Sequence, residues 1–153
     1  MKLFGMPTVP LVLTLAGVLP FAAGAGVILA AADQPILKAQ AGLVLLVYGA
    51  VILSFLGGLR WGAEITLHAD APRAGVLGLS VLGSLAGWAL VLWAFFGGAG
   101  WQVFAAGAGL HLLHGLWDVG ASGLPGWMRR LRLIAAACAV AALSAGSAAY
   151  FVR

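Results

Sequence analysis

Five apolar stretches occupy most of the chain, and each approaches the length of about 20 residues that a helix needs to cross a bilayer. Polar or glycine-rich segments separate them, and the alternation of apolar and polar residues typical of barrel strands is absent. The sequence therefore predicts an all-α, polytopic transmembrane helix bundle of about five helices, forming a single domain over residues 1–153. The expected helices cover residues 9–32, 39–61, 74–96, 101–117 and 133–152.

The composition excludes an ordinary soluble domain. The chain is 63% hydrophobic and 8% charged, whereas a soluble domain averages roughly 45–50% apolar and about 25% charged residues. The net charge of +4 comes from isolated Arg and Lys residues between apolar stretches, so nucleic acid is not an expected partner. The single cysteine, Cys138, excludes an internal disulfide and a multi-cysteine metal site. We expect no metal and no cofactor.

The first stretch has a second interpretation. Lys2, the apolar run and the alanines after Pro20 also resemble a secretory signal peptide. However, the apolar run continues well past Pro20 and one lysine makes a weak basic region, so we expect a helix that is retained. Pro10 suits the start of this helix, and Pro20 should kink it and free a carbonyl.

The basic residues predict the orientation in the membrane. With five spans, the N-terminus and the second and fourth connections share one side of the bilayer. That side carries Lys2, Arg60, Arg73, Arg129, Arg130 and Arg132, and the other carries Lys38 and Arg153. Because basic residues concentrate on the cytoplasmic side, we expect a cytoplasmic N-terminus and an external C-terminus.

Small residues recur at every fourth position of the second stretch, at Ala50, Ser54, Gly58 and Gly62. Helices in lipid associate through close approach of small residues, because lipid tails are as apolar as leucine. This stripe predicts either a central position for the second helix or a homodimer face, and both uses fit the pattern.

Polar residues inside the apolar stretches form a candidate site. Arg60 and Glu64 are four residues apart, so they share a helix face and can pair. Alternatively, Arg60 reaches the lipid headgroups and Glu64 is solvated. His111, His114 and Asp118 share one face of the fourth helix. The candidate cluster comprises Arg60, Glu64, His111, His114 and Asp118, with Tyr48 deeper on the second helix.

Several chemistries suit such a cluster. Neutral histidines can ligate haem iron or a transition metal, but two histidines three residues apart cannot ligate opposite faces of one haem. A quinone head group or a proton relay through His114 and Asp118 is also compatible, and so is a purely structural set of polar contacts. No nucleophile elbow, HExxH motif or Walker loop occurs in the sequence.

Three segments carry a family resemblance: Tyr48 to Gly62 (YGAVILSFLGGLRWG), Leu15 to Phe21 (LAGVLPF), and Leu124 to Arg132 (LPGWMRRLR), which follows Asp118. Together they resemble the domain of unknown function 3429 family, which comprises small bacterial inner-membrane proteins and a mitochondrial relative, transmembrane protein 69. The resemblance implies a multi-pass protein of the bacterial inner (cytoplasmic) membrane that keeps its first helix, and it implies no activity.

This chain departs from the family pattern near its polar residues. Met128 stands where family members often have tyrosine, and His111 and His114 match no family position. The resemblance therefore favours Arg60 and Asp118, rather than the histidines, as the site residues shared with the family.

Short connections, small-residue faces and the lack of a catalytic motif predict a non-enzymatic accessory or assembly factor of a membrane complex. Its expected partners are the lipid bilayer and other membrane subunits or a second copy. The alternatives are a small proton-coupled transporter using the charged cluster, and a quinone- or haem-binding membrane protein.

Overall fold

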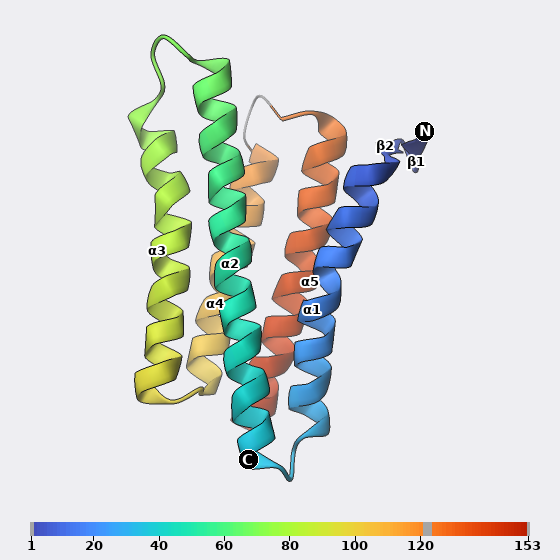
Figure 1. Ribbon diagram of the computed structural model, residues 1–153, viewed down its shortest axis with the longest axis vertical. Coiled ribbons are helices and arrows are strands. Elements are labelled where there is room, and N and C mark those ends of the chain that lie inside the picture. Colours follow the sequence, from blue (N-terminus) through green and yellow to red (C-terminus); the bar gives the residue numbers. More distant parts are fainter. Residues whose placement is uncertain (1, 121–123, 153) are drawn as a thin grey trace.

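The computed structural model describes residues 2–120 and 124–152, and this part of the chain contains five helices that run back and forth along one axis (Figure 1). The helices are α1 (Thr8–Ala30), α2 (Pro35–Leu67), α3 (Ala74–Gly97), α4 (Trp101–Gly120) and α5 (Gly126–Phe151). A short antiparallel ribbon, β1 (Lys2–Leu3) with β2 (Met6–Pro7), precedes α1. The predicted all-α bundle of about five helices is confirmed.

Two helices begin earlier than their apolar stretches predict. The second was expected from residue 39, but α2 begins at Pro35, a residue whose fixed φ suits the first turn of a helix. The fifth was expected from residue 133, but α5 begins at Gly126, directly after Pro125. Apolarity locates the part of a helix that faces lipid, and it does not reveal how far hydrogen-bonded turns continue through polar residues. As a result, α5 includes Arg132.

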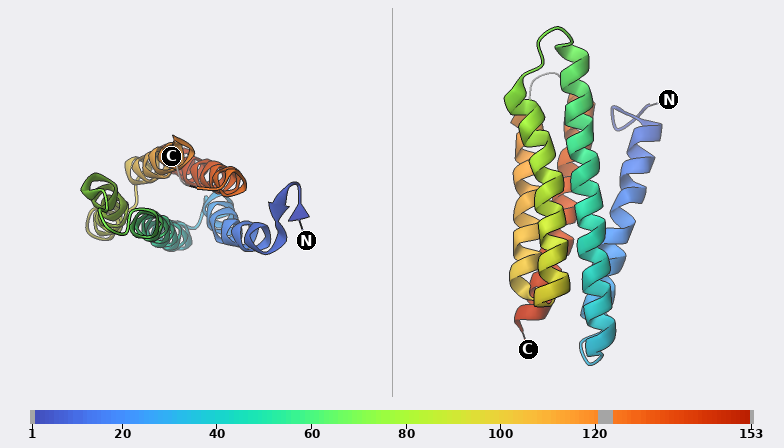
Figure 2. Two further views of the ribbon diagram at one scale, coloured as in Figure 1. Left: turned by 90° about the horizontal axis from the view of Figure 1, so that it is seen from above. Right: turned by 60° about the vertical axis from the view of Figure 1, so that its left-hand side comes forward.

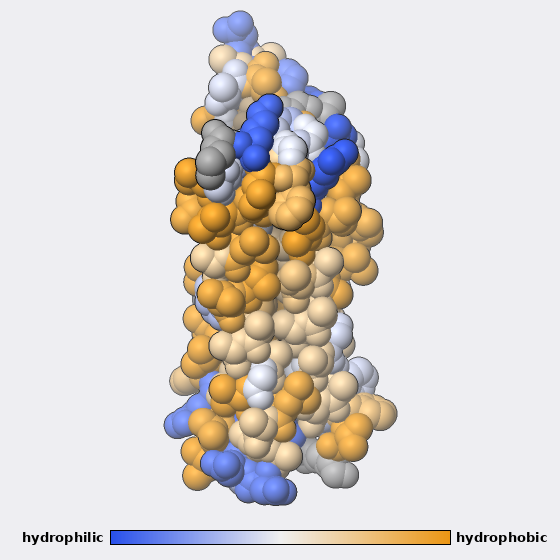
Figure 3. All heavy atoms as spheres, turned by 90° about the vertical axis from the view of Figure 1, so that its right-hand side faces the viewer, coloured by the Kyte–Doolittle hydropathy of each residue, from blue (hydrophilic) through white to orange (hydrophobic). Residues whose placement is uncertain are grey.

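The helices α1, α2, α3 and α5 are each long and apolar enough to cross a membrane. The helix α4 does not belong to this set, because His111, His114 and Asp118 lower its mean hydropathy. All three of these side chains are buried. The face drawn in Figure 3 shows a wide apolar band with hydrophilic residues gathered toward both ends, as expected for a protein that spans a bilayer.

Seen along the axis, α1, α2 and α3 form one layer and α4 and α5 form the other (Figure 2). The helix α2 contacts all four other helices, as expected of a central helix. The helix α1 packs on α2 and α5, but its N-terminal half diverges from α2 (Figure 2). This divergence leaves part of the α2 surface uncovered.

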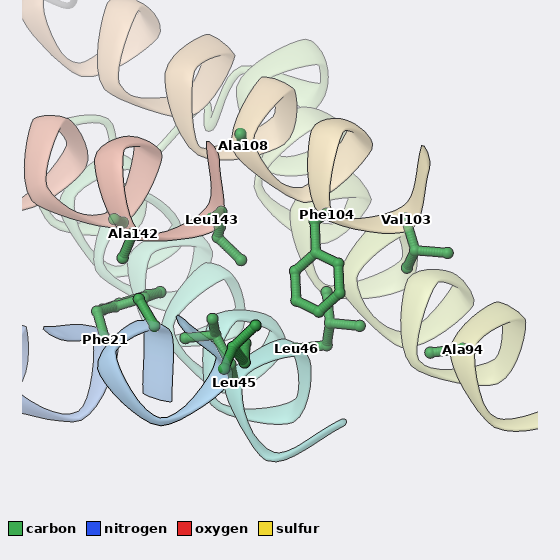
Figure 4. Packing of buried hydrophobic residues seen from close by; sticks show 12 residues of the cluster. Phe21, Leu45, Leu46, Ala94, Val103, Phe104, Ala108, Ala142 and Leu143 are labelled. Atoms are coloured by element: carbon green, nitrogen blue, oxygen red, sulfur yellow. The ribbon is translucent and has the colours of Figure 1, made fainter. Parts of the chain in front are cut away.

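The apolar core lies toward the end that carries the α1–α2 connection. Leu45, Phe104 and Leu143 are among its most buried side chains (Figure 4). Two glycines make room for the Phe104 ring, because a Cβ added at Gly42 or Gly146 would lie 3.0 Å from it. The buried charged residues Arg60, Glu64, Asp118 and Arg132 lie in the opposite half of the bundle, toward the α2–α3 connection.

Candidate functional site

Asp118 of α4 lies at the centre of a buried ionic cluster and is only 1% exposed. Arg132 of α5 donates a hydrogen bond from Nε to its Oδ2 atom. Arg60 of α2 approaches from the other side, with Nε 3.8 Å from Oδ1. His114, one turn before Asp118, places Nε2 3.9 Å from Oδ2. Three helices are therefore joined around one carboxylate.

The two guanidinium groups have further partners. Nη2 of Arg132 lies 3.4 Å from the Leu56 carbonyl and 3.4 Å from His114 Nε2. Arginine has no acceptor, so a hydrogen bond to this nitrogen requires a neutral His114 imidazole with its proton on Nδ1. Arg60 lies over the Trp117 ring, 4.5 Å from its centroid, an arrangement in which the aromatic face attracts the cation.

The predicted pairing of Arg60 with Glu64 is wrong, and so is the alternative of a solvated Glu64. Glu64 is 2% exposed, and its carboxylate accepts hydrogen bonds from Arg73: from the backbone N–H and Nε at 2.9 and 2.8 Å, and from Nη2 at 2.7 Å. His68 lies 3.4 Å away on the same carboxylate. The guanidinium of Arg73 thus meets both carboxylate oxygens of Glu64, and such bidentate pairs are among the strong hydrogen-bonded ion pairs.

The contact between Glu64 and Arg73 links the last turns of α2 to the start of α3 across the connection between these helices. Arg73 is the N-cap residue of α3, so Glu64 accepts a backbone N–H that the helix itself leaves without a partner. The side-chain hydrogen bond to Glu64 also raises the pKa of the Arg73 guanidinium. This ion pair is separate from the cluster around Asp118.

His111 and Tyr48 lie deeper and contact the same ring. The Phe21 ring is 5.4 Å from His111 and 5.0 Å from Tyr48, in edge-to-face arrangements. The Tyr48 hydroxyl donates to the Gly17 carbonyl at 2.7 Å, one turn before the helix-interior Pro20. Tyr48 thus joins α2 to α1 and makes no hydrogen bond to the ionic cluster in the described structure.

The small-residue stripe of α2 is divided between two environments. Ser54 lies 3.2 Å from Ser84 of α3, and Ala50 packs on Gly87 of the same helix. By contrast, a Cβ added at Gly58 or Gly62 would meet nothing within 4 Å.

A tight contact between α2 and α3 lies at Gly57, which the stripe does not include. A Cβ added there would lie 2.2 Å from the Ser80 carbonyl oxygen. The expected stripe runs through Gly58, whereas the tight contact with α3 is at the neighbouring Gly57.

Arg132 is the site residue that sequence reasoning missed, because it was assigned to a cytoplasmic connection. It is 7% exposed and points into the bundle. Its position seven residues into α5, combined with an unpaired carboxylate at Asp118, was the available clue.

A cleft of about 390 Å³ lies beside this cluster, between α1, α2 and α5. Its walls are mostly apolar, and Arg132 and His111 are its charged or ionisable side chains. Within residues 2–120 and 124–152, no group of three His, Cys, Asp or Glu side chains is placed to hold a metal ion. The cleft thus brings the side chains of Arg132 and His111, which can donate hydrogen bonds, to an otherwise mostly apolar wall.

The apolar exterior, the long helices and the buried ionic cluster define a polytopic α-helical membrane protein. The chain belongs to the family described as protein of unknown function DUF3429, whose family model matches residues 6–148. No curated protein and no solved structure matches the chain. Membership confirms the resemblance carried by the three sequence segments, and it assigns no activity.

Proposed function

We propose that the protein is a non-enzymatic accessory subunit or assembly factor of a larger complex in the bacterial inner membrane. The observation that carries this proposal is an uncovered apolar groove on α2. The groove measures about 630 Å³ and is lined by Phe55, Gly58, Leu59, Gly62, Ala63, Thr66, Leu67, Leu124 and Met128.

Two glycines in the groove have the spacing used at helix–helix contacts in membranes. Gly58 and Gly62 form a GxxxG pattern, which lets two helix backbones approach closely. No described side chain lies within 4 Å of a Cβ built on either glycine. A transmembrane helix of another subunit therefore has both room and a suitable surface on this face of α2.

The test is co-purification from native membranes in a mild detergent. Gly58→Leu and Gly62→Leu fill the groove, whereas Val51→Leu changes an exposed position of α2 outside it. We expect the unmodified protein and Val51→Leu to retain the same membrane subunits in a constant ratio, and both glycine variants to lose them. A partnerless monomer that acts alone on a small molecule would contradict the proposal, as would a homodimer without other subunits.

The proposed orientation places the N-terminus in the cytoplasm. Arg60 and Arg132 are buried and do not count as connection charges, but the exposed Lys2, Arg73, Arg129 and Arg130 remain at that end. At the opposite end Lys38 donates to the Ala149 carbonyl at 2.7 Å, and Arg153 lies outside the described residues. The charge difference still favours a cytoplasmic N-terminus.

Cysteine labelling in intact cells tests this orientation. In a Cys138→Ser background, we expect a membrane-impermeant maleimide to reach Asp33→Cys from outside and Ala69→Cys only after lysis. Both positions are exposed in connections at opposite ends of the bundle. The reverse labelling pattern would contradict the proposed orientation.

A further inference from the structure

We infer that the cleft between α1, α2 and α5 binds an anionic phospholipid, with the lipid oxyanion on Arg132 and an acyl chain along the apolar walls. The cleft volume of about 390 Å³ lies within the range of roughly 300–1,000 Å³ typical of ligand pockets. Val18, Ile52 and Ala135, from three different helices, are among the apolar residues that line it.

Not every polar atom beside the cleft has a hydrogen-bond partner within the described residues. Arg132 donates through Nε to Asp118, and its Nη2 faces the Leu56 carbonyl and His114. Its Nη1 is buried without a hydrogen-bond partner in the described structure. Buried donors without partners are rare and costly, so an acceptor is expected at this place.

The charge of the cluster identifies the kind of acceptor. Two guanidinium groups, from Arg60 and Arg132, face the single carboxylate of Asp118. The Glu64 carboxylate cannot offset the second one, because Arg73 occupies it. Protonation of a neighbouring histidine would only add positive charge. One surplus positive charge inside a membrane span is expensive, and an oxyanion would neutralise it, whereas a neutral quinone or alcohol would not.

The exposed rim of the cleft indicates where the occupant comes from. Leu13 of α1 and Phe55 of α2 line the cleft and are 67% and 61% exposed. Both are exposed apolar side chains, and Leu13 belongs to the N-terminal half of α1, the half that diverges from α2 (Figure 2). A molecule therefore enters sideways from the bilayer, which favours a membrane lipid over a water-soluble anion. Trp127, near the start of α5, also lines the cleft, so a headgroup can remain near the membrane surface.

Native mass spectrometry of the purified chain in a mild uncharged detergent tests this inference. Dioleoyl phosphatidylglycerol is the anionic probe, and dioleoyl phosphatidylcholine has the same chains on a headgroup without net charge. We expect the phosphatidylglycerol adduct to form at least tenfold more tightly, and Arg132→Gln to abolish this preference.

A matched pair of variants shows whether the lipid occupies this cleft. Ala135→Phe fills the cleft, whereas Ala137→Phe adds the same ring at an exposed position of α5 outside it. We expect Ala135→Phe to weaken binding at least tenfold and Ala137→Phe to leave it unchanged. This pair remains decisive if Arg132→Gln fails to fold.

Three results would overturn the inference. Equal binding of the two lipids would remove the role of charge, and unchanged binding by Ala135→Phe would place the lipid elsewhere. Displacement of phosphatidylglycerol by equimolar oleate or ubiquinone would show that a phospholipid is not the occupant.

Discussion

The packing of α2 on α3 can be tested at Gly57. A Cβ placed on this buried glycine would lie 2.2 Å from the Ser80 carbonyl oxygen and 3.2 Å from the Ser80 carbonyl carbon. Carbon–oxygen contacts between helices normally measure about 3.3–3.6 Å, so the two backbones must separate by about 1 Å. Forcing an extra carbon into a close-packed contact costs about 1–3 kcal/mol, and we expect Gly57→Ala to lower the free energy of unfolding by this amount.

The adjacent residue provides a control with the same chemical change. A Cβ at Gly58 would meet nothing within 4 Å, so Gly58→Ala should not lower the free energy of unfolding and can raise it by up to about 1 kcal/mol, because alanine favours a helix over glycine. Reversible unfolding in mixed micelles, followed by far-ultraviolet circular dichroism, measures both variants. Equal effects, or a larger loss for Gly58→Ala, would refute the observed register and support the stripe through Gly58.

Two further variants test contacts between the other elements. Tyr48→Phe removes the hydrogen bond to the Gly17 carbonyl. We expect the free energy of unfolding to fall by about 0.6 kcal/mol in the same assay, which is the average for interhelical hydrogen bonds in membranes. A variant more stable than the unmodified protein would contradict this contact. Glu64→Gln weakens the hydrogen bonds from the Arg73 backbone and side chain to residue 64. We therefore expect the amide hydrogens of the α2–α3 connection to exchange faster. Unchanged exchange would contradict the role of the ion pair.

Much of the fold could be predicted because lipid imposes a simple requirement. Every backbone polar group in the membrane must be satisfied within the protein, so an apolar stretch of sufficient length becomes a helix. All five helices follow from this requirement. The first turns of α5, from Gly126 to Arg132, do not follow from it, because they contain arginines and are not part of an apolar stretch.

The partners of charged residues could not be predicted in the same way. Helical spacing brings Arg60 and Glu64 to one face, but Glu64 and Asp118 pair with arginines of other helices, Arg73 at the start of α3 and Arg132 of α5. Local spacing identifies which side chains can meet, while the arrangement of the helices determines which ones do. The spacing of His111, His114 and Asp118 did predict their shared face, since all three are buried on the same side of α4.

The charge balance around Asp118 is the central claim, and the free energies of unfolding of three variants test it most directly. Asp118→Leu leaves the guanidinium groups of Arg60 and Arg132 buried without their carboxylate, and we expect a loss of about 3–5 kcal/mol. Adding Arg132→Met removes one of these cations, so the double variant should recover at least about 1 kcal/mol, and Arg132→Met alone should cost less than Asp118→Leu. A double variant whose loss equals the sum of the two single losses would contradict the buried pair.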